Sequence, residues 1–185
     1  MNKKKLLDKL ELEIIKDTVL PLRESNLVFG EGSADADILF IGEAPGANED
    51  RLCRPFVGRS GELLTDCIKN IGWQREHVYI TNIVKRRPPE NRDPSREEIK
   101  MYGQYLARQI QIINPRIIVA LGRFAMNYFL PGAKVSRDQG KIFIVNGYKV
   151  MPMFHPSAAL RGTAVLNKFK KTFKKLSTQK IKARL

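Results

Sequence analysis

The chain has 185 residues, 43% of them hydrophobic and 28% charged, a balance that is typical of a folded domain and excludes a disordered chain. It carries 33 Lys and Arg against 19 Asp and Glu, a formal net charge of +14, so we expect an anionic partner, either nucleic acid or an acidic membrane surface. Only Cys53 and Cys67 are present, which excludes a disulfide framework and a site built from four thiolates, and favours a reducing compartment.

The first half of the chain is expected to alternate between helices and strands. Residues 3–16 place leucines and isoleucines on one helical face. Residues 37–41 form a short apolar run that ends at a glycine, as buried strands often do. A second helix is expected over 61–71 and a second strand over 78–84.

The second half continues this alternation after a proline-rich loop over 86–94. Ser95 and Glu98 have the spacing of a capping box, which starts a helix. Asn146 and Gly147 are typical of a hairpin turn between two strands. The expected elements are a helix from Ser95 to about Ile113, a strand over 116–121, a helix over 123–129, strands over 142–145 and 149–154, and a helix over 167–176.

This order of elements predicts the α/β class, with residues 1–185 in a single domain. We expect a three-layer αβα sandwich around a central, mostly parallel, four-stranded sheet. Three polar or glycine-rich segments follow predicted strands: Gly42–Gly46, Asn82 and His155–Ser157. Ligands of open α/β sheets bind at the carboxyl ends of strands, so these segments are expected to meet at one edge of the sheet.

Two of these segments carry side chains suited to hydrolytic chemistry. Glu43 lies in a glycine-rich loop, where its carboxylate can position a water, although a solvated turn residue would look the same. His155 is fixed by a following proline and can donate a hydrogen bond to an oxyanion, and the alternative is a structural imidazole. His77 begins a strand away from the expected site and is interpreted as structural.

Other side chains are suited to holding a planar ring and phosphates. Phe56 can stack on a ring or pack in the core, and the carboxamide of Asn82 can match the edge of a pyrimidine or bond to neighbouring backbone. Arg59 and the amides near Ser60 can hold a phosphate. Residues 168–184 carry eight Lys or Arg and no acid, and we expect them to support attraction to an anionic partner without specificity.

Taken together, these segments resemble the family 4 uracil-DNA glycosylases. The likeness covers nearly the whole chain, in order and at the family's spacing. The matching stretches are Val28–Gly32, Ile41–Gly46, Glu49–Asp50, Arg54–Gly58, Thr81–Lys85, Arg87–Pro89, Asn91–Arg92, Leu121–Arg123, His155–Pro156 and Leu160–Arg161.

The resemblance implies an enzyme that flips uracil out of DNA and hydrolyses its glycosidic bond, initiating base-excision repair. It implies catalytic roles for Glu43, Asn82 and His155. It implies a base pocket formed by Gly42, Ala44, Pro45, Gly46, Glu49, Phe56 and Asn82, with Glu49 assigned to the exclusion of thymine. It implies DNA contacts at Arg59, Ser60, Lys85, Ser157, Leu160 and Arg161, with the last two filling the gap left by the flipped nucleotide.

One feature of the family is missing from this chain. Family 4 enzymes hold a four-iron cluster with four cysteines, and the matching positions here are Asp17, Leu20, Arg86 and Tyr102. We therefore expect no metal and no cofactor. We further predict that Asp17 forms an ion pair with Arg86 and that Leu20 packs on Tyr102, which would tie the N-terminal segment to the proline-rich loop.

The resemblance also sets the expected partner, the location and the alternatives. We expect uracil-containing DNA as substrate, a monomer, no membrane partner and a cytoplasmic location, since no apolar run reaches the ~20 residues of a spanning helix. A related branch traps uracil-DNA covalently through an arginine-rich insert with a His, which residues 85–92 lack, so turnover is expected. The alternatives are a uracil- or single-strand-binding module that does not cleave, and a glycosylase for hypoxanthine or another deaminated base.

Overall fold

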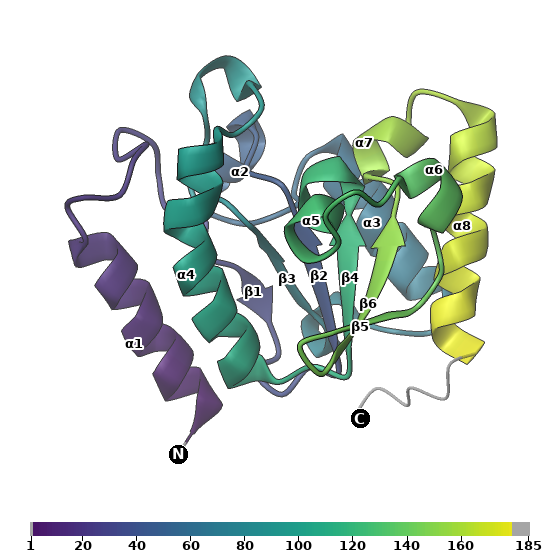
Figure 1. Ribbon diagram of the computed structural model, residues 1–185, viewed down its shortest axis with the longest axis horizontal. Coiled ribbons are helices and arrows are strands. Elements are labelled where there is room, and N and C mark those ends of the chain that lie inside the picture. The colour runs from purple at the N-terminus through teal and green to yellow at the C-terminus, as the bar shows by residue number, and fades with distance from the viewer. Residues whose placement is uncertain (1, 179–185) are drawn as a thin grey trace.

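The computed structural model describes residues 2–178, and its helices and strands alternate along the chain (Figure 1). The part of the basic run predicted beyond Thr178 lies outside the described residues. The elements are α1 (Lys3–Lys16), β1 (Glu31–Gly32), β2 (Ile38–Gly42), α2 (Ala47–Leu52), α3 (Arg59–Asn70), β3 (Tyr79–Asn82), α4 (Arg96–Ile113), β4 (Ile117–Leu121), α5 (Gly122–Phe129), α6 (Val135–Asp138), β5 (Phe143–Val145), β6 (Tyr148–Met153), α7 (Pro156–Ala159) and α8 (Thr163–Thr178), with 3₁₀ turns at Arg75–His77 and Pro89–Asn91.

The strands form one mixed sheet in the order β1-β3-β2-β4-β6-β5. The four central strands are parallel to one another, and the two edge strands, β1 and β5, are antiparallel to their neighbours. The mostly parallel α/β fold is therefore confirmed, but within residues 2–178 the sheet has six strands and not four. The hairpin between β5 and β6 is also confirmed, and its turn residues Asn146 and Gly147 take left-handed φ angles of 49° and 84°.

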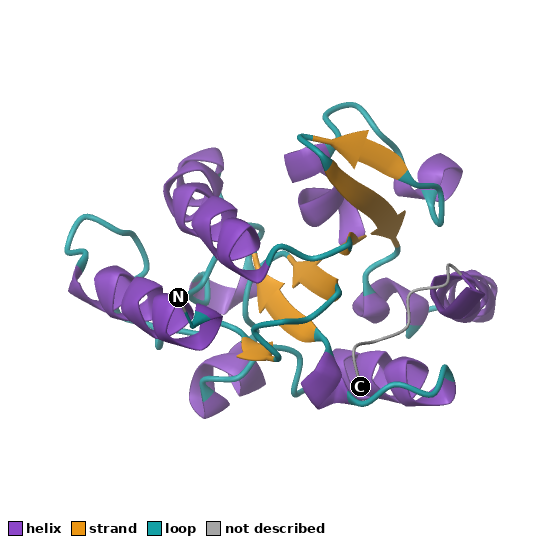
Figure 2. Ribbon diagram, turned by 90° about the horizontal axis from the view of Figure 1, so that it is seen from below, coloured by secondary structure: helices purple, strands orange, loops and turns teal. Residues whose placement is uncertain are grey.

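Helices cover both faces of the sheet, which gives the three expected layers (Figure 2). Successive strand residues point to opposite faces, so Leu39 and Ile41 of β2 join the core beneath α1, α4 and α5. Ile38 and Phe40 of the same strand join the core beneath α3 and α8. Because helices cover both faces, β2 and β4 are buried and apolar along their whole length. No helix within residues 2–178 is long and apolar enough to cross a lipid bilayer.

The strand predicted over 78–84 is shorter in the structure, where β3 ends at Asn82. Beyond it, the amides of Ile83 and Val84 donate to the carbonyls of Gly42 and Glu43, each at 3.0 Å. These bonds keep the chain beside the end of β2, although it has left the regular ladder. The apolar residues after Asn82 are therefore buried without extending the strand.

The ion pair predicted between Asp17 and Arg86 is wrong. Both residues lie within the described range, and no ion pair joins them there. Asp17 instead accepts a hydrogen bond from the Tyr105 hydroxyl at 2.5 Å, and Arg86 donates to the carbonyl of Ser25. Each charge has its partner on a different element, and Nε of Arg86 is buried without a partner among the described residues.

The other half of that prediction concerns Leu20 and Tyr102, and its two residues are buried in one core. Leu20, 3% exposed, and Tyr102, fully buried, belong to the same hydrophobic cluster. The Tyr102 hydroxyl also donates to the carbonyl of Pro21 at 2.7 Å. The segment after α1 is thus tied to α4 by apolar packing and by two tyrosine hydroxyls.

Candidate functional site

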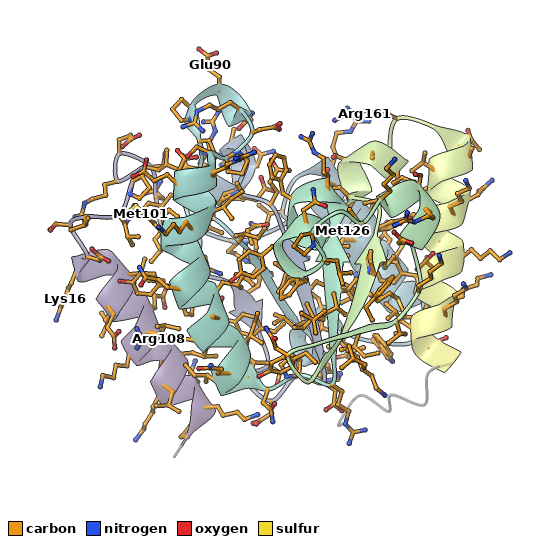
Figure 3. All side chains as sticks on the ribbon, viewed as in Figure 1. Lys16, Glu90, Met101, Arg108, Met126 and Arg161 are labelled. Atoms are coloured by element: carbon orange, nitrogen blue, oxygen red, sulfur yellow. The ribbon has the colours of Figure 1, made fainter. Side chains whose placement is uncertain are left out.

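A pocket of about 520 Å³ opens at the carboxyl ends of the parallel strands, within the size range of small-molecule sites. Figure 3 shows Glu90 and Arg161 at this end of the molecule, above the sheet. The pocket is lined by Glu43, Ala44, Pro45, Gly46, Glu49, Phe56, Ser60, Asn82, Pro88, Asn91, Arg92, Asp93, Gly122, Arg123, His155, Ser157 and Arg161. It therefore combines residues from both halves of the chain.

At the inner end of the pocket, Gly42 allows a phenyl ring and a carboxamide to approach the same backbone. A Cβ at Gly42 would lie 2.3 Å from Oδ1 of Asn82 and 2.5 Å from Cζ of Phe56, far inside van der Waals contact. Only glycine leaves room for both groups. This close approach explains why a glycine ends β2.

The carboxamide of Asn82 is only 2% exposed and has no hydrogen-bond partner among residues 2–178. The carboxamide opens on the pocket, where water or a ligand can satisfy it. Asn82 therefore offers an acceptor and two donors to a molecule in the pocket.

Phe56 is held in place by Glu49 of α2. The Glu49 carboxylate accepts from the amides of Val57 and Gly58, both at 3.0 Å. Phe56 itself has a left-handed φ of 51°, which is uncommon for a residue with a side chain and requires such external support. Glu49 thus acts on the loop that presents the ring, and its assigned role in excluding thymine stays a prediction.

His155 lies beside Phe56, with 5.6 Å between the ring centroids and 32° between their planes. The amide of Ser157 donates to Nδ1 at 3.2 Å, and the Ser157 hydroxyl lies 2.7 Å from the same nitrogen and can donate to it as well. With Nδ1 as the acceptor, the neutral ring carries its proton on Nε2. Burial lowers the pKa of His155 to about 4, against the opposing effect of the Glu49 carboxylate. At neutral pH the imidazole is therefore neutral and presents an N–H donor.

Glu43 is partly buried at the start of the β2–α2 loop. Burial is the main effect that raises its pKa to about 7, the Asp93 carboxylate adds to it, and Arg123 opposes it. Asp93 and Arg123 form an exposed ion pair at 2.8 Å on the rim of the pocket. A carboxyl with a pKa near neutrality is suited to positioning or activating a water.

Residues 29–177 match the family model described as the uracil DNA glycosylase superfamily. The chain belongs to this superfamily. It is 48% identical over 160 residues to the type-4 uracil-DNA glycosylase of Thermotoga maritima, an alignment that covers 81% of this chain and 83% of the relative. It is 43% identical over 162 residues to the type-4 enzyme of Archaeoglobus fulgidus, covering 83% and 81%. It is 30% identical over 167 residues to the type-5 uracil-DNA glycosylase of Pyrobaculum aerophilum, covering 77% and 74%.

Within this superfamily member, most residues singled out from the sequence lie together. Gly42 is packed against Asn82 and Phe56 of the pocket. The remaining predicted site residues line the pocket directly, with three exceptions: Arg59, Leu160 and Lys85. Arg59 and Leu160 lie on the surrounding surface, where Leu160 is 42% exposed. His77, interpreted as structural, lies outside the pocket in a 3₁₀ turn.

The third exception is Lys85, for which a DNA contact is wrong. Its side chain is completely buried and donates to three oxygens behind Asn82. Nucleic acid cannot reach it without unfolding this part of the protein.

Six pocket residues were not assigned from the sequence: Pro88, Asn91, Arg92, Asp93, Gly122 and Arg123. Gly122 and Arg123 begin α5 directly after β4, so the strand-end argument applies to them as it does to Asn82. The other four lie in the proline-rich loop, which no local pattern directs toward the pocket. All of them except Asp93 lie in stretches that resemble the family 4 enzymes, and this resemblance was a signal that could have assigned them to the site.

The positions that match the cluster cysteines do not fit an iron–sulfur centre. Leu20 is a buried apolar side chain, and the buried Tyr102 uses its hydroxyl in a hydrogen bond to Pro21. Arg86 places a cation where the cluster would need a thiolate. In the described range, no group of three or more His, Cys, Asp or Glu is arranged to hold a metal ion. Cys53 is exposed and Cys67 is buried, as ordinary thiols.

Proposed function

We propose that this chain hydrolyses the N-glycosidic bond of uracil flipped out of DNA, and that it does so as a monomeric single domain without an iron–sulfur cluster. The observation that carries the proposal is the unpartnered carboxamide of Asn82 beside the rings of Phe56 and His155. The type-4 relatives, 41–48% identical, support the same reaction. The net charge of +14 supports DNA as the partner.

Recognition of the base would rest on Phe56 and Asn82. The phenyl ring offers a face for stacking, and the carboxamide offers an acceptor for the N3–H of uracil and a donor for its O4. Cytosine presents the opposite pattern on that edge. Discrimination between the two bases would therefore come from one side chain.

Departure of the base would rest on His155. Uracil leaves as an anion, and a preorganised donor aimed at the developing charge is usually the largest contribution to such a reaction. The Nε2–H of the neutral ring has no partner among the described residues and is available for this purpose. Because its Nδ1 is already held by Ser157, the ring needs no reorientation.

Addition of water to C1′ would rest on Glu43. Its carboxylate form predominates above pH about 7 and can orient a water while stabilising the positive charge that develops on the sugar. The backbone of Gly42–Gly46 would shape the space for this water. Arg59, Ser60, Ser157 and Arg161 would hold the phosphates on either side, with Leu160 entering the stack.

The test is an incubation with labelled oligonucleotides that carry uracil, hypoxanthine or only normal bases, followed by hot alkali. Strand cleavage at uracil alone is the expected result. Binding of the uracil strand without alkali-sensitive sites would support a non-catalytic module, and cleavage only at hypoxanthine would change the substrate. Iron and sulfide analysis of the same active preparation tests the cluster: stoichiometric iron would contradict this part of the proposal.

A further inference from the structure

Lys85 is a buried cation directly behind the base-reading residue of the site. Its side chain is 0% exposed. Its Nζ donates to Oγ1 of Thr81 at 2.6 Å, to the main-chain carbonyl of Asn82 at 2.8 Å and to Oε1 of Gln109 at 2.6 Å. Among residues 2–178 no carboxylate forms an ion pair with it. The ammonium is therefore held by three neutral oxygens, and the centroid of the Phe29 ring lies 5.9 Å from it.

The surrounding hydrogen bonds require three N–H donors at this position. The Thr81 hydroxyl donates its own hydrogen to the carbonyl of Phe29 at 2.7 Å, so its oxygen accepts from Lys85. The Gln109 amide donates to the same carbonyl and to the Tyr79 hydroxyl, both at 3.2 Å, which directs Oε1 toward the ammonium. Burial lowers the pKa of Lys85, and these three acceptors favour the charged form against that effect.

A cation in this place is costly for stability. Removing an ammonium from water without a carboxylate partner carries a large desolvation penalty, and well-packed apolar side chains often replace buried charges without loss. The neighbouring core already contains large apolar side chains, among them Phe29, whose ring faces the ammonium. Packing alone therefore does not account for a lysine here, and its contacts indicate what it does.

Those contacts fix the backbone at the point where the site begins. Asn82 is the last residue of β3, and the amide of the next residue, Ile83, donates to the Gly42 carbonyl. The ammonium binds the other side of the same peptide group, through the Asn82 carbonyl. The peptide that carries the Asn82 side chain is thus held from both directions, by β2 and by Lys85.

We propose that Lys85 is the positioning residue for Asn82: its ammonium clamps the main-chain carbonyl of Asn82 and so orients the carboxamide toward the base. The proposal rests on the proposed glycosylase function. It gives Lys85 a role through the backbone, in place of a contact with DNA. It also identifies Gln109 and Thr81, which lie outside the pocket, as supports of base recognition.

The test is a double-mutant cycle on single-turnover excision of uracil from a single-stranded oligonucleotide. Lys85→Met keeps the length of the side chain and removes its donors, and we expect roughly a 10²-fold loss of rate, as for a displacement of about 1 Å at a reacting group. In an Asn82→Ala background, the same change is expected to cost no more than about twofold, because the group it positions is already gone. Binding of an oligonucleotide with only normal bases should stay within about twofold, because Lys85 touches no DNA, whereas binding of the uracil strand should weaken only in the background that keeps Asn82.

A structural role would give a different result. Loss of the full 10²-fold in both backgrounds, or no loss in either, overturns the proposal. Leu10→Ala is the matched control, because Leu10 is buried in the same core cluster and its truncation lowers stability without touching the Asn82 peptide. It should excise uracil at the wild-type rate at temperatures where it is folded.

A second variant covers the case in which Lys85→Met does not fold. Gln109→Met removes one of the three acceptors, and it should show a smaller loss of rate that again disappears in the Asn82→Ala background. Additive effects for Gln109→Met overturn the proposal. A wild-type protein that excises no uracil overturns the proposed function and this role with it, whereas an active wild type with an unaffected Lys85→Met overturns the role alone.

Discussion

Gly42→Ala perturbs the pocket by a single methyl group. The added Cβ would lie 2.3 Å from Oδ1 of Asn82 and 2.5 Å from Cζ of Phe56, whereas ordinary contact begins at 3.4 Å. The carboxamide or the ring must therefore move by about 1 Å, a displacement that can cost roughly 10²-fold in rate. Because the moved groups are those that hold the base, the loss should fall on the chemical step and on base binding alike.

The assay is single-turnover excision of uracil at saturating enzyme, with a melting curve for each variant. Gly162→Ala is the matched control, because a Cβ at Gly162 meets nothing within 4 Å and the residue needs no left-handed φ. This control should keep the wild-type rate. Wild-type excision by Gly42→Ala would refute the placement of the base between Asn82 and Phe56.

Three further predictions concern protonation, base choice and stability. Burial raises the pKa of Glu43 to about 7, so the rate of the wild-type protein should rise with pH through that value as the carboxylate forms. A Glu43→Gln variant whose pH–rate profile kept the same inflection would contradict the assignment of this pKa to Glu43. Asn82→Asp replaces a donor by an acceptor and should admit cytosine, so excision of cytosine from a labelled strand is expected, and strict uracil specificity would count against edge reading. Tyr105→Phe removes the hydroxyl that donates to Asp17 and should lower the free energy of unfolding, measured in urea, by about 1 kcal/mol. The effect stays this small because the Asp17 carboxylate is largely solvated. An unchanged urea midpoint would show that this hydrogen bond adds no stability.

Local sequence signals predicted most of the fold. Both hydrogen bonds of the Ser95–Glu98 capping box are present, each side chain accepting from the other residue's amide, and the box begins α4 as expected. Asn146–Gly147 forms the hairpin turn because both residues tolerate a left-handed φ. Short elements such as α2 and α7 were missed, because four to six residues carry too little periodicity to indicate a helix.

The site was predictable where it depends on topology. Parallel strands bring their carboxyl ends to one edge, which is why Glu43, Asn82 and His155 meet although they are far apart in sequence. The support of Phe56 by Glu49 was not predictable, because it depends on two backbone amides and a left-handed φ that no pattern encodes. The orientation of each side chain is set by tertiary contacts.

Charge alone was a poor guide to contacts. A lysine that follows a strand in a basic protein suggests a phosphate contact, yet Lys85 turns inward because Thr81 and Gln109 offer acceptors there. Asp17 and Arg86 have opposite charges, yet a tyrosine hydroxyl and a backbone carbonyl are their partners. In both cases the side chain binds neutral groups and not the charged partner that the sequence suggested.

The most direct measurement is the single-turnover rate of uracil excision by His155→Ala, with oligonucleotide binding measured in parallel. A loss of about 10²-fold in rate with little change in binding is expected, because the Nε2–H donor matters only as negative charge develops on the departing base. Excision at the wild-type rate would contradict the claim that this imidazole stabilises the leaving uracil, and the catalytic pocket would have to lie elsewhere.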